Sequence, residues 1–142
     1  MEYTSENRGV IQYREWSKQI IDFSGLRYGN ITPTDIDGYI DFHNQLTILM
    51  EFKYGNAKLP YGQKLAYQRM IDDIEKSGKP AYLLVCSHNI ELAKDVPAAY
   101  TYVKGIYHKK KWYVGNRMAR DVINAIKNMH SLKIYNQYPS IQ

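Results

Sequence analysis

The sequence contains only one cysteine, Cys86, among its 142 residues. A single cysteine excludes an intrachain disulfide framework and a cysteine-based zinc site within one chain. The four histidines do not compensate, because their positions show none of the spacings typical of zinc ligands. Cys86 lies in an apolar run, so we expect a small residue of the hydrophobic core.

Long apolar runs and targeting signals are also missing. No apolar run approaches the roughly 20 residues that a membrane-spanning helix needs. Residues 1–6 have neither the basic nor the apolar region of a signal peptide. No serine or cysteine is paired with a histidine in a recognisable motif, which argues against acyl transfer. We therefore expect a cytoplasmic protein without membrane partners.

The composition that is present suits one soluble globular domain. Hydrophobic residues make up 44% of the chain and charged residues 23%. We expect a single domain over residues 1–142, with flexible ends at residues 1–8 and 135–142. The net charge of +5 suits a polyanionic partner, and some of the 14 tyrosines are candidates for base stacking as well as for core edges. Composition thus leans slightly towards nucleic acid.

Hydrophobic periodicity predicts an alternation of helices and strands. The predicted elements are a helix at 9–21, strands at 36–42 and 46–53, a helix at 62–76, strands at 81–87, 98–107 and 111–114, and a last helix that follows Gly115 and Asn116. This order, α-β-β-α-β-β-β-α, indicates an α/β fold in which helices flank a central mixed β-sheet on both faces.

The hairpin at 36–53 carries unusual polar residues. Residues 46–52 are almost all apolar, which is typical of a central strand that is covered on both sides. The strand nevertheless ends with Glu51 and Lys53, whose side chains point the same way because strand side chains alternate. A carboxylate and an amine at this position are costly unless they are paired, hydrated or bound to metal. The strand end is therefore a candidate site.

The length of the hairpin loop decides what lies opposite Glu51. A three-residue loop at 43–45 places Tyr39 opposite Leu49, and Asp37 opposite Glu51 on the same face. The central asparagine of this loop tolerates the left-handed conformation that such loops require. A two-residue loop would send the two carboxylates to opposite faces. The site hypothesis thus needs an odd-length loop, or a bulge that restores the parity.

Two neighbouring carboxylates form a hard-oxygen site. Mg²⁺ commonly binds one or two carboxylates together with waters and substrate phosphates, and the Phe52 carbonyl adds a further protein oxygen to Asp37 and Glu51. Such a metal ion would lower the pKa of a bound water and polarise a phosphodiester. Lys53 would orient that water or stabilise the charge developing on phosphorus. The set matches phosphodiester hydrolysis.

The Asp-Gly pair at 37–38 before one strand and residues 51–53 at the end of the next resemble the PD-(D/E)XK nuclease superfamily. Gln63 and Tyr67 form a Q-x-x-x-Y pattern, which is similar to the motif after the catalytic lysine in RecB-type and related exonuclease members. The resemblance covers roughly residues 13–74. It implies a restriction-endonuclease-like core, Mg²⁺ or Mn²⁺, and cleavage of DNA or RNA. The catalytic residues it implies are Asp37, Glu51, Lys53, Gln63 and Tyr67.

Some positions depart from the family pattern. Ile36 stands before Asp37 where members carry proline, and Asp35 has the parity to compete for the metal-binding role. Many members also have a glutamate on the first helix. Glu15 is the candidate for that catalytic position and Asp22 a weaker one, with a solvated helix face as the alternative for Glu15.

Basic residues flank the proposed site. Lys58, Lys64 and Arg69 are candidates for phosphate binding, although for any one of them taken singly a solvated helix surface is the favoured interpretation. The lysines at 109–111 form a basic hairpin tip, which either tracks a nucleic-acid backbone or protects an edge strand from aggregation.

The sequence favours a metal-dependent nuclease acting on nucleic acid, with DNA as the preferred substrate class. A homo-oligomer or a larger DNA-processing assembly stays open. The alternatives are a non-catalytic nucleic-acid- or protein-binding module on the same fold, and a protein-interaction domain whose resemblance is accidental. Asp37 and Glu51 on opposite faces of the sheet would support the last of these.

Overall fold

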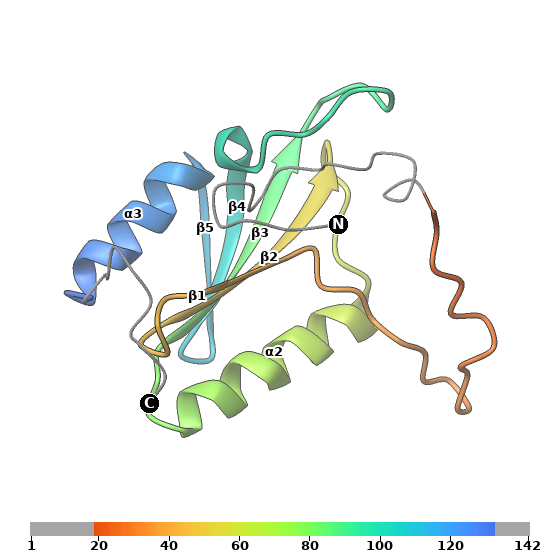
Figure 1. Cartoon of the computed structure of the whole chain (residues 1–142), viewed down its shortest axis with the longest axis horizontal. Coiled ribbons are helices and arrows are strands. Elements are labelled where there is room, and N and C mark those ends of the chain that lie inside the picture. The colour runs from red at the N-terminus through yellow and green to blue at the C-terminus, as the bar shows by residue number, and fades with distance from the viewer. Residues whose placement is uncertain (1–18, 133–142) are drawn as a thin grey trace, which may run out of the picture. The chain divides into compact units, whose positions relative to one another are not determined.

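The computed structural model describes residues 19–132 of the chain (Figure 1). Glu15 and the ends predicted to be flexible, residues 1–8 and 135–142, lie outside this range. The chain divides into two units, of which the first ends at Pro33 and the second begins at Thr34.

The first unit contains no helix in its described part, residues 19–33. The helix predicted at 9–21 was expected to include residues 19–21, and for this end the prediction is wrong. Ile20 and Ile21 are both exposed. Helical turns gain most of their stability from packing of an apolar face, and these two side chains provide no such packing.

The second unit is built on one five-stranded sheet. Its strands are β1 (Gly38–Asp41), β2 (Thr47–Tyr54), β3 (Ala81–His88), β4 (Tyr102–His108) and β5 (Lys111–Met118). They lie side by side in the order β1-β2-β3-β4-β5. Only β2 and β3 run parallel, and the other neighbouring pairs are antiparallel. The predicted mixed sheet is thus confirmed.

Two helices, α2 (Tyr61–Lys76) and α3 (Ala119–Met129), cover opposite faces of this sheet (Figure 1). One hydrophobic cluster joins α2 to the sheet and contains Leu49, Tyr67, Ile71, Leu83 and Tyr107. A second cluster joins α3 to the other face and includes Ile48, Met50, Leu84, Val122 and Ile126. Because side chains of a strand alternate, odd-numbered residues of β2 face α2. Neither helix is long and apolar enough to cross a membrane, within the described residues.

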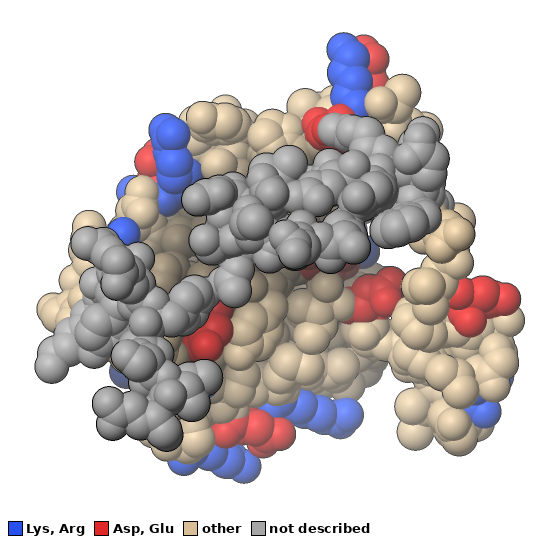
Figure 2. Space-filling model, in the orientation of Figure 1, with Lys and Arg blue, Asp and Glu red and all other residues tan. Residues whose placement is uncertain are grey.

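The outward face of α2 is a solvated surface of mixed charge. Arg69, Asp73 and Lys76 are exposed on it. Figure 2 shows basic and acidic side chains intermixed along the edge where α2 runs in Figure 1. This helix therefore contributes to the site through its inward face.

The β1–β2 hairpin has the predicted three-residue loop. The Gln45 N–H donates to the Phe42 carbonyl at 2.9 Å, and the Phe42 N–H donates to the Leu46 carbonyl at 3.0 Å. His43 and Asn44 adopt positive φ angles of 51° and 61°. Loop residues in this left-handed region let the chain reverse over a short distance.

The strand register agrees with the prediction from the loop length. Tyr39 lies opposite Leu49, and the pair at the end of the ladder is Gly38 with Met50. Continuing this register by one residue sets Asp37 opposite Glu51. The alternation of side chains then directs both carboxylates to the face that α2 covers.

The C-terminal half differs from the prediction in two places. The segment predicted as one strand at 98–107 begins with the 3₁₀ turn η2 (Ala98–Tyr100), and the strand starts only at Tyr102. Gly115 and Asn116 continue β5 and do not lead into the helix, which begins at Ala119. β4 pairs with β5 on both sides of the Gly-Asn pair, at Val114 and again at Arg117 and Met118, and this pairing overrides the turn preference of the two residues.

Cys86 occupies the core, as its apolar surroundings predicted. Its side chain is fully buried in β3. Burial raises the pKa of the thiol to about 11, against a smaller lowering by a hydrogen bond with Thr101. Cys86 is therefore a protonated thiol at neutral pH, which suits a packing role.

Candidate functional site

The site is centred on Glu51, which is buried between β2 and α2 with only 4% of its surface exposed. The Tyr67 hydroxyl lies 2.5 Å from Glu51 Oε2, and Gln63 Nε2 donates to Glu51 Oε1 at 3.3 Å. Gln63 and Tyr67 are four residues apart, so they share one face of α2. The helix therefore presents two polar groups to a single carboxylate.

Lys53 lies beside the same carboxylate. Its Nζ is 3.6 Å from Glu51 Oε1, and 23% of the lysine side chain is exposed. The strand places both residues on the face that α2 covers, because they are two positions apart. The amine is thus close to the buried carboxylate and still reaches solvent.

Asp37 is held at the end of the β1–β2 ladder. Its Oδ2 accepts a hydrogen bond of 2.9 Å from the Phe52 N–H. Strand β1 begins only at Gly38, so the aspartate side chain takes a backbone donor of β2 that has no partner residue within β1. This bond anchors one oxygen of Asp37 and positions the carboxyl group next to Glu51.

The electrostatics of the site disfavour the negative charge of Glu51. Burial is the main cause that raises its pKa above the ordinary 4.5, and the hydrogen bond with Tyr67 is the main opposing cause. The charge of Asp37 and a hydrogen bond with it raise the pKa of Glu51 further, and Lys53 lowers it. The two carboxylates therefore hold more negative charge than Lys53 alone compensates.

Tyr67 stays protonated beside this carboxylate. Burial, followed by the hydrogen bond with Glu51 and its charge, raises the pKa of the phenol far above 10. The hydroxyl also lies 3.0 Å from the backbone carbonyl of Asp35. A phenol has one proton, so it donates to one of these two acceptors at a time. A proton on Glu51 would allow Glu51 to donate to Tyr67 while Tyr67 donates to Asp35.

The donor set fits a hard divalent cation. Asp37 and Glu51 offer carboxylate oxygens on one face, and Mg²⁺ in proteins often uses no more than two carboxylates. A residue in an antiparallel strand directs its N–H and C=O towards the same neighbour. The Phe52 carbonyl therefore faces the edge where the Phe52 N–H binds Asp37. Within residues 19–132 there is no group of three or more His, Cys, Asp or Glu side chains placed to hold a metal ion.

Of the remaining candidates, one contacts this arrangement, one belongs to the other unit and one is not described. Asp35 contributes its backbone carbonyl to Tyr67. Asp22 belongs to the first unit, where its Oδ1 accepts a hydrogen bond from the Ser24 N–H at 2.9 Å. That hydrogen bond is the main cause that lowers the pKa of Asp22. Glu15 lies outside the described residues.

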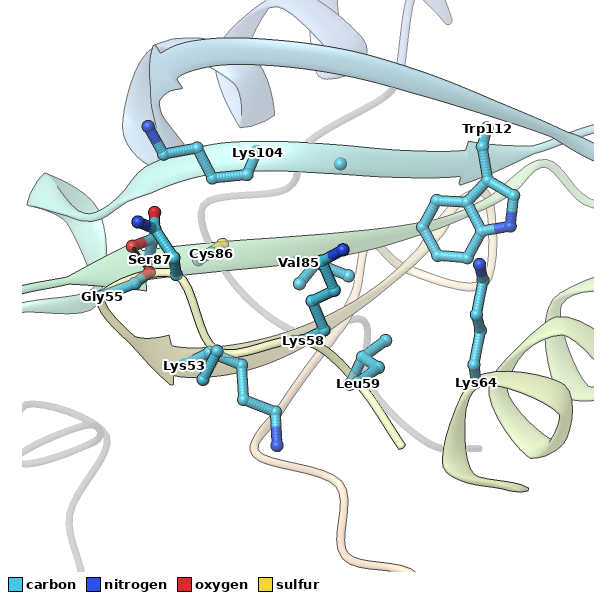
Figure 3. Close-up of a pocket in the computed structure, with 13 residues that line it drawn as sticks. Lys53, Gly55, Lys58, Leu59, Lys64, Val85, Cys86, Ser87, Lys104 and Trp112 are labelled. Carbon is cyan, nitrogen blue, oxygen red and sulfur yellow. Dashed lines mark hydrogen bonds between the residues drawn. The ribbon is translucent and has the colours of Figure 1, made fainter. Parts of the chain in front are cut away.

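A cavity of about 550 Å³ adjoins the site, and sequence reasoning missed it. Lys53, Lys58 and Lys64 line it, and so do two residues from the far strands, Lys104 and Trp112 (Figure 3). Arg69 is not among its lining residues. Lys104 and Trp112 belong to no motif near the site in sequence, and only the pairing of β3, β4 and β5 brings them to it.

Comparison with known proteins adds no relative. The chain matches no protein-family model, and neither the curated proteins nor the solved structures contain a significant match.

Proposed function

We propose that the protein is a metal-dependent nuclease of the PD-(D/E)XK type, which hydrolyses phosphodiester bonds of nucleic acid in the cytoplasm. Mg²⁺ or Mn²⁺ is the proposed cofactor, and DNA is the favoured substrate. The main support is the convergence of Asp37, Glu51 and Lys53 on one face of the β1–β2 hairpin. That face is the one on which Tyr67 and Gln63 contact Glu51.

Each residue has a distinct task in this proposal. Asp37 and Glu51, with the Phe52 carbonyl, hold the cation, which supplies Lewis-acid chemistry to phosphate ester hydrolysis. Gln63 and Tyr67 fix the Glu51 carboxylate by hydrogen bonds, so that its orientation does not depend on solvent. Lys53 orients the attacking water and stabilises negative charge that develops on the phosphate oxygens.

Incubation of the purified full chain with Mn²⁺ and a panel of DNA and RNA substrates tests the proposal. Cleavage is expected for the wild type, with a loss of at least about a hundredfold in Glu51→Ala and in Lys53→Ala. Glu91 and Lys94 provide a matched control, because they form an ion pair of 3.6 Å whose side chains are well exposed. Alanine at either control position should leave cleavage unchanged. Full activity in Glu51→Ala or Lys53→Ala would contradict the assignment.

A non-catalytic nucleic-acid-binding module is the second candidate. The cavity beside the site favours it, because its lysines can bind phosphates without any metal ion. Salt-sensitive binding of nucleic acid together with no cleavage of any substrate in Mn²⁺ would favour the module over the nuclease.

A further inference from the structure

The cavity next to Glu51 carries charge of one sign only. Four lysines line it, and Asp and Glu are absent from its described lining. Three of them, Lys58, Lys64 and Lys104, together with Trp112, define what we call the lysine cleft. The fourth, Lys53, belongs to the candidate site and lies where that site meets the cleft. The cleft is thus a continuation of the site along the sheet.

The lysines of the cleft come from separate parts of the chain and line one cavity. Lys58 lies in the loop before α2, Lys64 in the first turn of α2, and Lys104 in β4. Figure 3 shows the amines of Lys58 and Lys64 directed from the α2 side towards the sheet. The register between β3 and β4 shifts after Val85, so Lys104 and the following residue, Gly105, both line the cavity. Bulges of this kind redirect side chains and often lie next to functional sites.

No described carboxylate compensates these three charges. The ion pairs of residues 19–132 involve Lys53, Lys94 and His108 as cations, and none involves Lys58, Lys64 or Lys104. Lys104 donates a hydrogen bond to the neutral side-chain oxygen of Asn116. Lys64 Nζ lies 4.9 Å from the centre of the Trp112 ring. Like charges around one hollow repel one another, so a ligand with several negative charges would relieve the repulsion.

The size of the cleft restricts the ligand. A volume of about 550 Å³ is in the range of small-molecule sites, which is about 300 to 1,000 Å³. An unpaired nucleotide with its phosphates is of that scale. A duplex is not, since its major groove alone is about 12 Å wide. Trp112 adds an aromatic ring to the lining, with the Lys64 amine over it, and aromatic rings are the surfaces on which unpaired bases stack.

We propose that the lysine cleft binds an unpaired stretch of the substrate strand directly beside the scissile phosphate, so that substrates with single-stranded ends are preferred over continuous duplex. The proposal rests on the proposed nuclease function, since Lys53 links the cleft to Glu51. A free nucleotide shares the same chemistry and is the rival ligand.

Binding without cleavage separates these possibilities. The full chain with Glu51→Gln, in EDTA, is titrated into three labelled probes: a short single-stranded DNA, a duplex of equal length and a mononucleotide. Fluorescence anisotropy should show the tightest binding for the single strand. Adding Lys58→Ala and Lys64→Ala should weaken that binding at least about tenfold and flatten its salt dependence, since each single-strand phosphate contact contributes about 0.7 to the log–log slope.

A second lysine pair supplies the control for charge. Lys79→Ala with Lys94→Ala removes the same net charge outside the cleft and should leave affinity nearly unchanged. Equal weakening by both pairs would overturn the proposal, and so would duplex binding as tight as that of the single strand. Saturation by the mononucleotide at the affinity of the strand would also overturn it, in favour of a nucleotide pocket.

The experiments distinguish an error in the cleft proposal from an error in the proposed nuclease function. Binding of the single strand that depends on Lys58 and Lys64, without cleavage in any metal ion, would reject the nuclease and keep the cleft. Cleavage that requires Glu51 but is indifferent to Lys58 and Lys64 would reject the cleft and keep the nuclease. Thermal unfolding of each variant checks that the fold is intact.

Discussion

Glu51 is a buried carboxylate whose negative charge is disfavoured in the folded protein. Desolvation at the end of β2 raises its pKa, and neighbouring Asp37 adds to the effect. Gln63, Tyr67 and Lys53 provide the contacts that make this position tolerable. A buried, perturbed carboxylate beside a second one is a common feature of functional sites. The loss of stability that the negative charge of Glu51 causes should be measurable in the metal-free protein.

Glu51→Gln should stabilise the metal-free protein above neutral pH. Because the folded-state pKa of Glu51 is raised above 4.5, its contribution to stability is present at low pH and is lost as pH rises through the raised value. Glutamine removes this loss while keeping the shape. The unfolding midpoint at about pH 8 should rise by a few degrees, the shift that about 1 kcal/mol produces in a domain of this size.

The pH dependence of that difference identifies its cause. The midpoints of wild type and Glu51→Gln should converge as pH falls below 4.5, where Glu51 becomes protonated in the unfolded state as well as in the folded state. Glu91→Gln is the control, because Glu91 is an exposed glutamate. It should change the midpoint little at any pH. An unfolding midpoint of Glu51→Gln below that of the wild type at about pH 8 would contradict the claim that the charge of Glu51 destabilises the fold.

Gly38 shows why an Asp-Gly pair suits this position. A Cβ built on Gly38 would lie 3.3 Å from Met50 Cβ, which is tighter than ordinary contact. Glycine thus allows β1 to approach β2 closely immediately after Asp37. This close approach at the end of the ladder is compatible with the bond from the Phe52 N–H to Asp37.

The β1–β2 hairpin and α2 were predictable because their determinants are local. The turn residues at 43–45 set the register, and a spacing of four residues set the shared face of Gln63 and Tyr67. The lysine cleft was not predictable in this way. Lys104 and Trp112 reach the site through strand pairing and a bulge, which depend on contacts distant in sequence.

The predicted end of the last strand was wrong for a related reason. Gly115 and Asn116 have the local preferences of a turn, and the prediction placed the start of the last helix there. In the fold, Met118 pairs with Tyr102 at the far end of the ladder, so β5 extends to Met118. Tertiary pairing therefore overrode local preference at this position.

The β4–β5 turn contains two lysines in a conformation that lysine disfavours. Lys109 and Lys110 have φ angles of 49° and 64°. Such two-residue turns favour Asn-Gly. The variant Lys109→Asn/Lys110→Gly should therefore raise the free energy of unfolding by about 1 kcal/mol, measured by denaturant titration. The backbone N–H of residue 109 keeps its hydrogen bond to Glu75 in this variant.

A second turn variant separates backbone strain from charge. Lys109→Ala/Lys110→Ala removes the same two charges but keeps a Cβ at both positions, so it should not gain this stability. Equal stability of the Asn-Gly and Ala-Ala variants would show that charge repulsion, and not backbone conformation, sets the cost. The Asn-Gly variant removes two lysines of the basic tip without destabilising the fold, so it also tests whether this tip binds nucleic acid.

At the scale of the whole molecule, the second unit places the candidate metal site and the lysine cleft on the same face of the sheet. The net charge of +5 is thus less informative than its distribution, since α2 mixes both signs on its outward face (Figure 2) and the cleft carries lysines only. An acidic centre beside a basic cleft suits a cation and a polyanion that bind together.

Metal binding should therefore increase the free energy of unfolding of the whole second unit. A ligand that binds only the folded state stabilises it by about 2.7 kcal/mol at 100 times its Kd. Mn²⁺ should raise the unfolding midpoint of the wild type, and Asp37→Asn or Glu51→Gln should abolish most of that increase. Because the pKa of Glu51 is raised, protons compete with the ion for this carboxylate at lower pH. The increase should consequently be larger at about pH 8 than at about pH 6. An equal increase in Glu51→Gln, or a larger one at the lower pH, would place the bound ion elsewhere on the protein.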